Sequence, residues 1–259
     1  IPGRADPYQE NAMPRAIAYH RPDSVEDVVA LLDDESHRPL AGGTVLNGDD
    51  DPTPVTMVDL QGCGLEGIGD DAGRLRLGAM TTLHDMLDDD RVPTGLAGAA
   101  QAELPSTLRT LATVGGTVAT GDPDSVLVAA LLVHDARVEL VGPGGSEMLP
   151  LANLLKAGVA ASHVITAVEV DLSGDGDCVR QSTARTPSDT PIVSATARTA
   201  GDGVRLALTG MAAYPVLVDP LDPTAGLEPI SDFRGSADYR RTLAKVLAKR
   251  AASAVGGVT

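Results

Sequence analysis

Apolar residues recur along this chain with two periods, one typical of helices and the other of strands. In the stretch SVEDVVALL, apolar side chains three and four residues apart fall on one helical face, and Ser24 can cap the first turn. Periodicity and capping residues together predict helices at 24–32, 81–87, 94–104, 125–135, 149–155 and 236–255. Short apolar stretches that end at glycine or charged residues predict strands at 37–41, 54–60, 74–80 and 136–141.

From Val164 onward the pattern changes to successive strand-like stretches with turn residues between them. These stretches predict antiparallel strands at 164–172, 178–186, 191–199, 203–211 and 213–219. We therefore expect an α+β protein that divides near residue 160. A mixed α/β part would precede the division, and a sheet with a final helix would follow it.

The composition shows that aromatic side chains cannot fill the core of this protein. The 259 residues include no Trp, one Phe and four Tyr, so Ala, Val and Leu must fill it. The formal net charge of −16 argues against partners such as nucleic acid or an anionic membrane surface. No apolar run is long enough to span a bilayer, and the first residues lack the apolar core of a signal peptide. We expect a cytoplasmic protein, with Met13 as a candidate natural start.

The cysteines and histidines show no spacing typical of a metal site. Cys63 and Cys178 stand far apart and form no Cys-x-x-Cys pair, and none of the five histidines has a metal-binding spacing. The sequence therefore predicts neither an iron–sulfur cluster nor a structural zinc on this chain.

Two Gly-Gly-Thr loops carry the candidate chemistry, one at Gly42–Thr44 and the other at Gly115–Thr117. Glycine turns at positive φ and lets backbone N–H groups converge on an anion. Two such loops could close on the pyrophosphate of a dinucleotide, with hydroxyl groups added by Thr44 and Thr113. On the loops alone, a role as tight turns is favoured over phosphate binding.

Several collinear stretches resemble one known family. They are YHRPDSVEDVVALL, PLAGGT, LRLGAMTTLHDML, LRTLATVGGTVATGDPDS, AALLVHDARVEL and FRGSADYRRTLAKVLAKRA. In this order they resemble the FAD-binding (medium) subunit of molybdenum hydroxylases, the group of carbon monoxide dehydrogenase and xanthine dehydrogenase. The resemblance implies a two-part FAD-binding α/β domain of the PCMH type at 13–160, with its glycine loops at 41–44 and 113–117. A small antiparallel-sheet domain with helices would follow at 161–255.

The same resemblance implies a flavoprotein oxidoreductase. FAD would take electrons from an iron–sulfur subunit and pass them to an external acceptor, while the clusters and the molybdopterin cofactor lie on partner subunits. The resemblance identifies no catalytic residue. The residues it implies for FAD binding are Ala41, Gly42, Gly43, Thr44, Val45, Arg109, Thr113, Val114, Gly115, Gly116, Thr117, Asp122 and Val126.

The chain departs from the family pattern at several polar positions. Thr117 replaces an asparagine, Val126 replaces an aspartate that helps to hold FAD, and Val45 stands where a polar residue is common. Each lost contact is worth about 1 kcal/mol, so FAD could bind more weakly. One alternative is therefore a flavin-free enzyme, such as a cyclase or isomerase that acts alone on an apolar small molecule in the former FAD cleft. Another is a non-catalytic assembly subunit.

Overall fold

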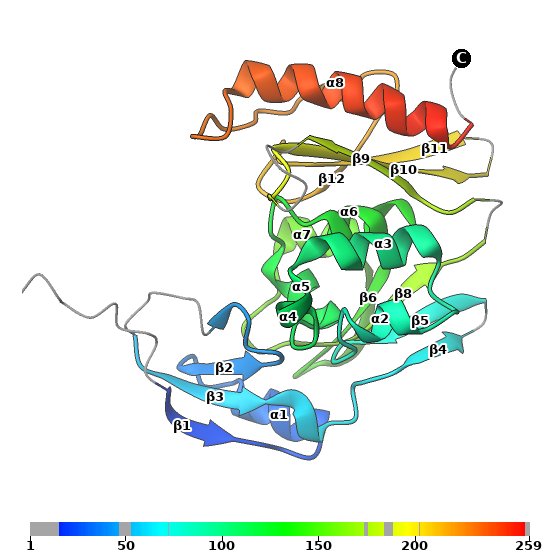
Figure 1. Cartoon of the computed structure of the whole chain (residues 1–259). Helices are drawn as coiled ribbons and strands as arrows, with labels where there is room; N and C mark the ends of the chain where they lie inside the picture. Colours follow the sequence, from blue (N-terminus) through cyan, green and yellow to red (C-terminus); the bar gives the residue numbers. More distant parts are fainter. Residues whose placement is uncertain are drawn as a thin grey trace, which may run out of the picture.

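The computed structural model describes residues 16–46, 53–71, 73–173, 176–183, 189–201 and 203–256. Within these ranges the strands form three sheets, which Figure 1 shows one above the other with helices between and around them. The α+β class predicted from the sequence is confirmed. Met13 lies outside the described residues. Among the described residues, no helix has the length and apolar character needed to cross a membrane.

The lowest layer in Figure 1 is a parallel three-stranded sheet with the order β1-β3-β2. Its elements are β1 (Ala16–His20), α1 (Val25–Leu31), β2 (His37–Leu40), β3 (Val55–Asp59) and the short 3₁₀ helix η2 (Leu60–Gly62). Ser24 caps α1 by accepting the Asp27 N–H, as the sequence predicted. Val28 of α1 packs with Val58 and Val164, so the layer shares its core with the layer above.

The middle layer is an antiparallel sheet with the order β4-β5-β8-β6-β7. Its strands are β4 (Ile68–Asp71), β5 (Arg74–Gly78), β6 (Arg137–Gly142), β7 (Gly145–Pro150) and β8 (Val164–Asp171). The sequence placed β8 at the start of the C-terminal sheet, and this placement is wrong, because β8 pairs with β5 and β6. The division near residue 160 stays a prediction, although these pairings join β8 to the sheet formed by the preceding part of the chain.

Helices cover one side of this middle sheet. They are α2 (Asp85–Asp88), α3 (Thr94–Glu103), α4 (Ser106–Arg109), α5 (Val114–Thr120), α6 (Val126–Val133) and α7 (Leu151–Ala157). Every residue of α6 is buried, as expected for a helix that is apolar on all sides. It contacts α3 as well as the strands β10 (Val193–Ala200) and β11 (Gly203–Thr209) of the upper layer, and it therefore links the two layers.

The upper layer is an antiparallel sheet with the order β12-β11-β10-β9, covered by one long helix (Figure 1). Its elements are β9 (Val179–Thr183), β10 (Val193–Ala200), β11 (Gly203–Thr209), β12 (Val216–Val218) and α8 (Ala237–Ala254). Alanines on both faces, such as Ala248 of α8 and Ala195 of β10, bury their side chains in this interface. Small side chains therefore fill this core, as the composition required.

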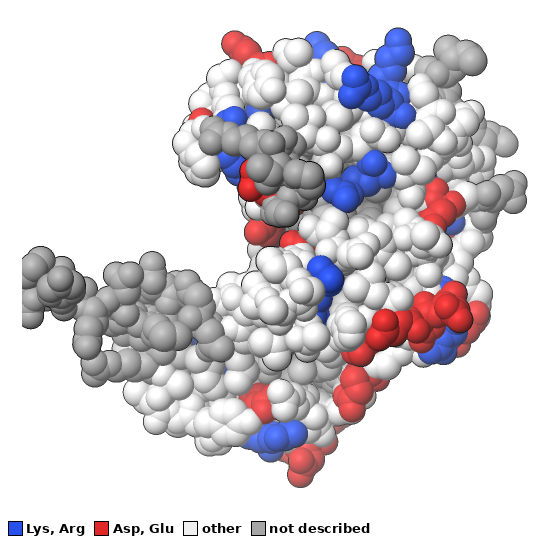
Figure 2. Space-filling view, in the orientation of Figure 1, with Lys and Arg blue, Asp and Glu red and all other residues white. Residues whose placement is uncertain are grey.

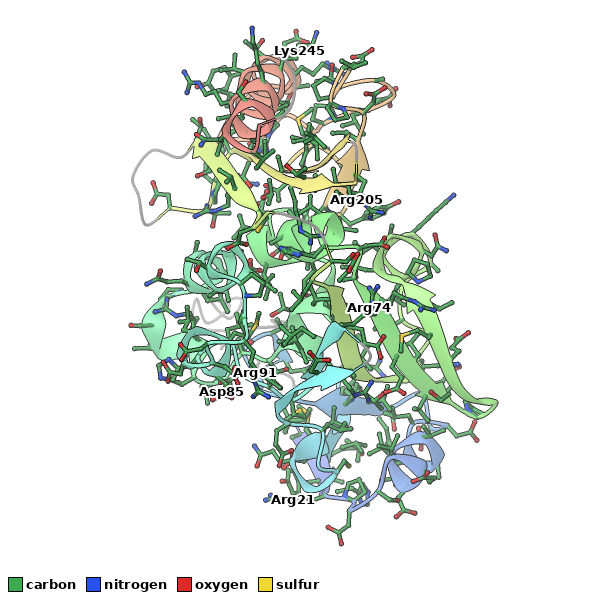
Figure 3. All side chains as sticks on the ribbon, turned by 90° about the vertical axis from the view of Figure 1, so that its right-hand side faces the viewer. Arg21, Arg74, Asp85, Arg91, Arg205 and Lys245 are labelled. Atoms are coloured by element: carbon green, nitrogen blue, oxygen red, sulfur yellow. The ribbon has the colours of Figure 1, made fainter. Side chains whose placement is uncertain are left out.

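Charged side chains also join the middle and upper layers. Arg74 of β5 donates to the Asp135 carbonyl oxygen over 2.7 Å, and Arg205 of β11 donates to the Asp135 carboxylate over 2.7 Å. Figure 3 shows the two arginines on their separate layers.

The surface is acidic near α2, where Asp85, Asp88 and Asp90 are exposed and where Figure 2 shows red side chains gathered.

The start of α5 lies against the turn that follows β5. The Gly115 N–H donates to the Ala79 carbonyl oxygen over 2.8 Å, and the Val114 N–H donates to the Thr81 carbonyl oxygen over 2.9 Å. A Cβ on Gly115 would lie 2.6 Å from the Ala79 Cβ and 2.9 Å from the Ala79 oxygen. Glycine at this position is therefore required by packing between elements.

Gly115→Ala should lower the free energy of unfolding by about 1–3 kcal/mol, because the added methyl group overpacks a rigid backbone contact. The matched control is Gly98→Ala in α3, where a Cβ would meet nothing within 4 Å. In this control the free energy of unfolding should rise by about 0.5–1 kcal/mol, the usual difference between alanine and glycine inside a helix. Urea denaturation measures both. A Gly115→Ala protein as stable as the wild type would contradict the packing described here.

Candidate cofactor-binding site

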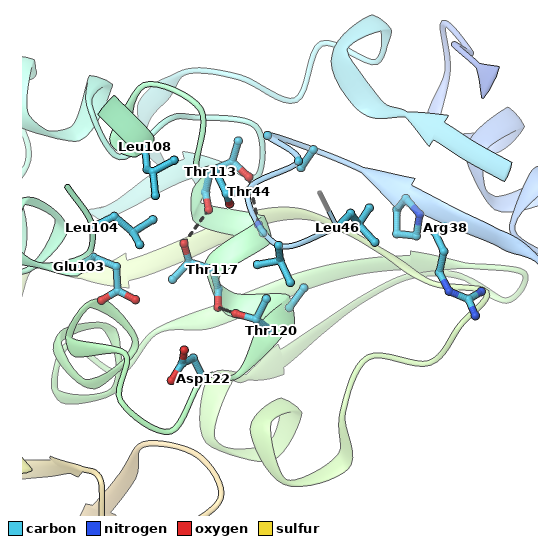
Figure 4. A pocket seen from close by; sticks show the side chains of 17 residues that line it. Arg38, Thr44, Leu46, Glu103, Leu104, Leu108, Thr113, Thr117, Thr120 and Asp122 are labelled. Carbon is cyan, nitrogen blue, oxygen red and sulfur yellow. Dashed lines mark hydrogen bonds between the residues drawn. The ribbon is translucent and has the colours of Figure 1, made fainter. Parts of the chain in front are cut away.

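A cavity of about 380 Å³ lies between the two glycine loops (Figure 4). The residues predicted from the sequence that line it are Ala41, Gly42, Gly43, Thr44, Val45, Thr113, Gly116, Thr117 and Asp122. The two loops, which are separated by about seventy positions in the chain, are thus parts of one wall. The structure brings both Gly-Gly-Thr motifs to a single concave site.

The first loop, between β2 and β3, is shaped by its glycines. Gly43 has φ +70°, a left-handed conformation that favours glycine. A Cβ on Gly42 would lie 1.7 Å from the Leu111 carbonyl oxygen. The first loop therefore rests directly on the backbone that leads into the second loop, and no larger residue fits at Gly42 without moving one of them.

The first loop also carries unused hydrogen-bond donors. In the described part of the chain, the backbone N–H groups of Gly42, Gly43 and Thr44 make no hydrogen bond. The same holds for the Thr44 hydroxyl group. Successive N–H groups on a turn form a concave anion site, so this loop suits a phosphate group.

The second loop uses its own N–H groups to build α5. The Gly116 N–H donates to the Thr113 hydroxyl oxygen over 3.1 Å, and the Thr117 N–H donates to the Thr113 carbonyl oxygen over 2.9 Å. The expectation that both loops offer backbone amides to an anion is therefore wrong for the second loop. This loop instead offers an open surface at Gly116, where a Cβ would meet only the Thr113 hydroxyl at 3.0 Å and Ala41 at 3.9 Å.

Four of the predicted site residues lie outside this cavity. Val114 and Gly115 are buried in the packing of α5, and Gly115 lines a smaller cavity of about 90 Å³ behind the loops. The Arg109 guanidinium donates to the carbonyl oxygens of Gln101 and Leu104, so it fastens the end of α3. Val126 is only 2% exposed and packs inside the protein as the first residue of α6. It therefore provides no wall of this cavity.

Glu103 is a cavity residue that the sequence reasoning missed. Its carboxylate accepts the Leu127 N–H over 2.8 Å, across 24 positions of the chain, and thereby caps α6. Burial raises the pKa of Glu103, while hydrogen bonds from the Ser125 hydroxyl and from the N–H groups of Leu127 and Val126 oppose the rise. No local motif signals this role, because it depends on the end of α3 crossing the start of α6.

Charge is distributed unevenly around the cavity. Figure 4 shows Arg38 at one end, and Glu103 and Asp122 at the other. The Asp122 carboxylate also accepts the Asp124 N–H over 2.8 Å, so part of its function is local. Leu104 and Leu108 supply apolar wall on the same side as Glu103 (Figure 4). The cavity combines donors for an anion, acceptors for hydroxyl groups, and apolar surface for a ring.

Comparison with known proteins places this geometry in a family. A family model described as the FAD binding domain in molybdopterin dehydrogenase matches residues 15–171. The carbon monoxide dehydrogenase medium chain of Afipia carboxidovorans is 28% identical, over 92% of this chain and 96% of the relative. The uncharacterized protein YgfM of Escherichia coli K12 is 30% identical, over 88% of this chain and 92% of the relative.

The fold agrees with that of a solved relative. The carbon monoxide dehydrogenase from Hydrogenophaga pseudoflava, solved in a form that lacks the Mo-pyranopterin moiety of its molybdenum cofactor, contains a chain that superimposes with a TM-score of 0.84. The two chains are 25% identical, and the match covers 93% of this chain and 98% of that one. This chain belongs to the family of FAD-binding domains of molybdopterin dehydrogenases.

Proposed function

We propose that this chain is the FAD-binding subunit of a molybdenum hydroxylase, with FAD held in the cavity between the glycine loops. The observation that carries the proposal is the convergence of both loops on one cavity, with unused N–H donors on the first loop. When bound, FAD supplies the redox chemistry, since the flavin ring accepts and releases electrons. The chain itself positions the cofactor and sets its surroundings.

The first loop would hold the pyrophosphate. The N–H groups of Gly42, Gly43 and Thr44 are available for this role because they make no other hydrogen bond in the described structure. The bare surface of Gly116 lines the same cavity and allows a phosphate to approach the backbone of α5. In a chain with a net charge of −16, backbone donors of this kind bind an anion without a lysine or arginine cluster.

Glu103 and Asp122 would accept hydrogen bonds from hydroxyl groups of the cofactor. Val126 stands at the position where the family carries an aspartate, but its side chain is buried away from the cavity. The Glu103 carboxylate reaches the same helix start from α3 and does line the cavity. We infer that Glu103 supplies the acidic contact that Val126 cannot, so the missing aspartate does not argue against FAD.

The partners would be an iron–sulfur subunit and a molybdopterin subunit. Support comes from relatives that are themselves medium subunits, such as the nicotine 6-hydroxylase medium subunit of Paenarthrobacter nicotinovorans, 27% identical over 94% of this chain.

Titration of the purified chain with FAD, followed by quenching of flavin fluorescence, tests the proposal that this chain binds FAD. A wild-type chain that binds no FAD would contradict it and favour a cofactor-free enzyme.

Gly116→Val should weaken FAD binding about a hundredfold or more, because a branched side chain would fill the surface where the phosphate approaches and would displace several contacts. Fluorescence titration measures affinity, and thermal melting of the FAD-free chain checks the fold. Gly98→Val, in the open part of α3, is the control and should keep wild-type affinity. Unchanged flavin stoichiometry and affinity in Gly116→Val would show that FAD lies elsewhere.

Glu103→Gln should weaken FAD binding about tenfold while the fold stays intact. The amide oxygen can still accept the Leu127 N–H, whereas the charge-assisted hydrogen bond to a cofactor hydroxyl is lost. Glu147→Gln on the exposed part of β7 is the matched control and should have no effect. Equal FAD affinity in both variants would remove Glu103 from the cofactor site without affecting the case for FAD itself.

Val126→Asp should reduce stability and should not tighten FAD. The new carboxylate would be buried inside the protein, close to Glu103, which already binds the Val126 N–H. Burying such a group without a partner costs about 2 kcal/mol or more. Chemical denaturation and FAD titration of the variant measure the two effects. A stable variant with tighter FAD binding would show that an acid at position 126 can reach the cofactor after all.

A further inference from the structure

A second group of chemically competent side chains lies where α6 ends, next to α3 and the residues just before β9 (Figure 1). His134, Asp177 and Cys178 each place one possible ligand atom within 4.8 Å of the other two. None of the three lines the cavity between the glycine loops. This cluster is therefore separate from the proposed FAD site.

His134 presents an unused nitrogen to the cluster. Its ring is 1% exposed, and Nδ1 lies 3.3 Å from the Asp171 carbonyl oxygen, so Nδ1 is the nitrogen that carries the proton. Among the described residues, Nε2 is then a buried lone pair with no hydrogen-bond partner, and the Asp177 carboxylate is 4.0 Å from it.

The other two side chains are held in place by the backbone. The Asp177 carboxylate accepts the N–H groups of Gly95 and Cys178, which caps the start of α3 and leaves further lone pairs free. Cys178 is 6% exposed, whereas the Asp177 side chain is 36% exposed and opens a path to solvent. Capping and core packing account for Asp177 and Cys178, but in the described part of the chain they leave the His134 Nε2 atom without a hydrogen-bond partner.

We propose that His134 Nε2, an Asp177 carboxylate oxygen and Cys178 Sγ bind one divalent cation of the zinc type. Nitrogen, sulfur and oxygen ligands of these kinds are those that Zn²⁺ takes in proteins, and a histidine whose other N–H donates to a backbone carbonyl is the usual arrangement. Binding breaks the Cys178 S–H bond, forms a sulfur–metal bond and releases the proton to solvent.

The three ligands themselves balance the charge of a divalent cation, while the cationic side chains of Arg198 and Arg180 also act on the cluster. One thiolate and one carboxylate cancel its charge, and the imidazole is neutral. The nearby Arg198 already donates to the carbonyl oxygens of Gly176 and Ser173, so it does not need the Asp177 carboxylate as a partner. The ion would tie the segment before β9 to α6 and so strengthen the junction of the middle and upper layers.

Cobalt provides the test, because Co²⁺ takes zinc sites and absorbs visibly. The full chain carrying Cys63→Ser has Cys178 as its single thiol. After treatment with a chelator, it should bind one equivalent of Co²⁺, with d–d bands and a thiolate-to-cobalt charge-transfer band in the difference spectrum. Zn²⁺ should displace both signals. Cys178→Ser, which keeps the size of the side chain, should lose the charge-transfer band while wild type and Cys63→Ser retain it.

Thermal melting provides the second readout. Zn²⁺ should raise the melting temperature of wild type and Cys63→Ser, and should leave that of Cys178→Ser unchanged. Absence of a thiolate-to-cobalt band in Cys63→Ser would overturn the proposal. This outcome requires only that Cys63→Ser folds, and it is independent of whether the chain binds FAD.

Discussion

Contact between bare backbone segments determines where the glycine loops lie. Gly42 rests on the Leu111 carbonyl, and Gly115 rests on Ala79, in both cases at distances that leave no room for a Cβ. The first contact joins the lower layer to the second loop, and the second joins α5 to the middle sheet. The cavity exists because these contacts hold two loops that are far apart in the sequence at a fixed separation. One glycine of each pair is therefore required for packing, whether or not a ligand binds.

The two loops nevertheless contribute different chemistry. The N–H groups of the second loop form hydrogen bonds within the first turn of α5, and Thr113 caps this helix. The first loop, which begins no described α-helix, retains its donors. The first Gly-Gly-Thr motif therefore offers hydrogen-bond donors to the cavity, whereas the second offers a backbone surface without free donors. This asymmetry follows from where each loop stands relative to a helix and could not be deduced from the shared Gly-Gly-Thr letters.

Local signals in the sequence identified most of the helices. Ser24 caps α1 as expected, and Ser125 and Ser236 cap α6 and α8, because a cap depends on residues within one turn. The short helix expected from residue 81 begins later, at Asp85, since Thr82 pairs with Thr113 in an isolated bridge. The unexpected strands β1, β4 and β7 are all at sheet edges. Edge strands bury little apolar surface, so they leave a weak pattern.

Contacts over long distances in the chain account for what the sequence could not show. The apolar pattern of β8 identified a strand but not its neighbours, since a buried strand has the same apolar sequence pattern whichever sheet it joins. The same limit explains why Val126 was assigned to the site and Glu103 was missed. The resemblance marked the start of α6 as a place for an acid, and in the structure the carboxylate at this helix start belongs to Glu103 of α3. A carboxylate supplied from another helix preserves the chemistry of a site while changing the position in the sequence, so a lost motif residue need not mean a lost function.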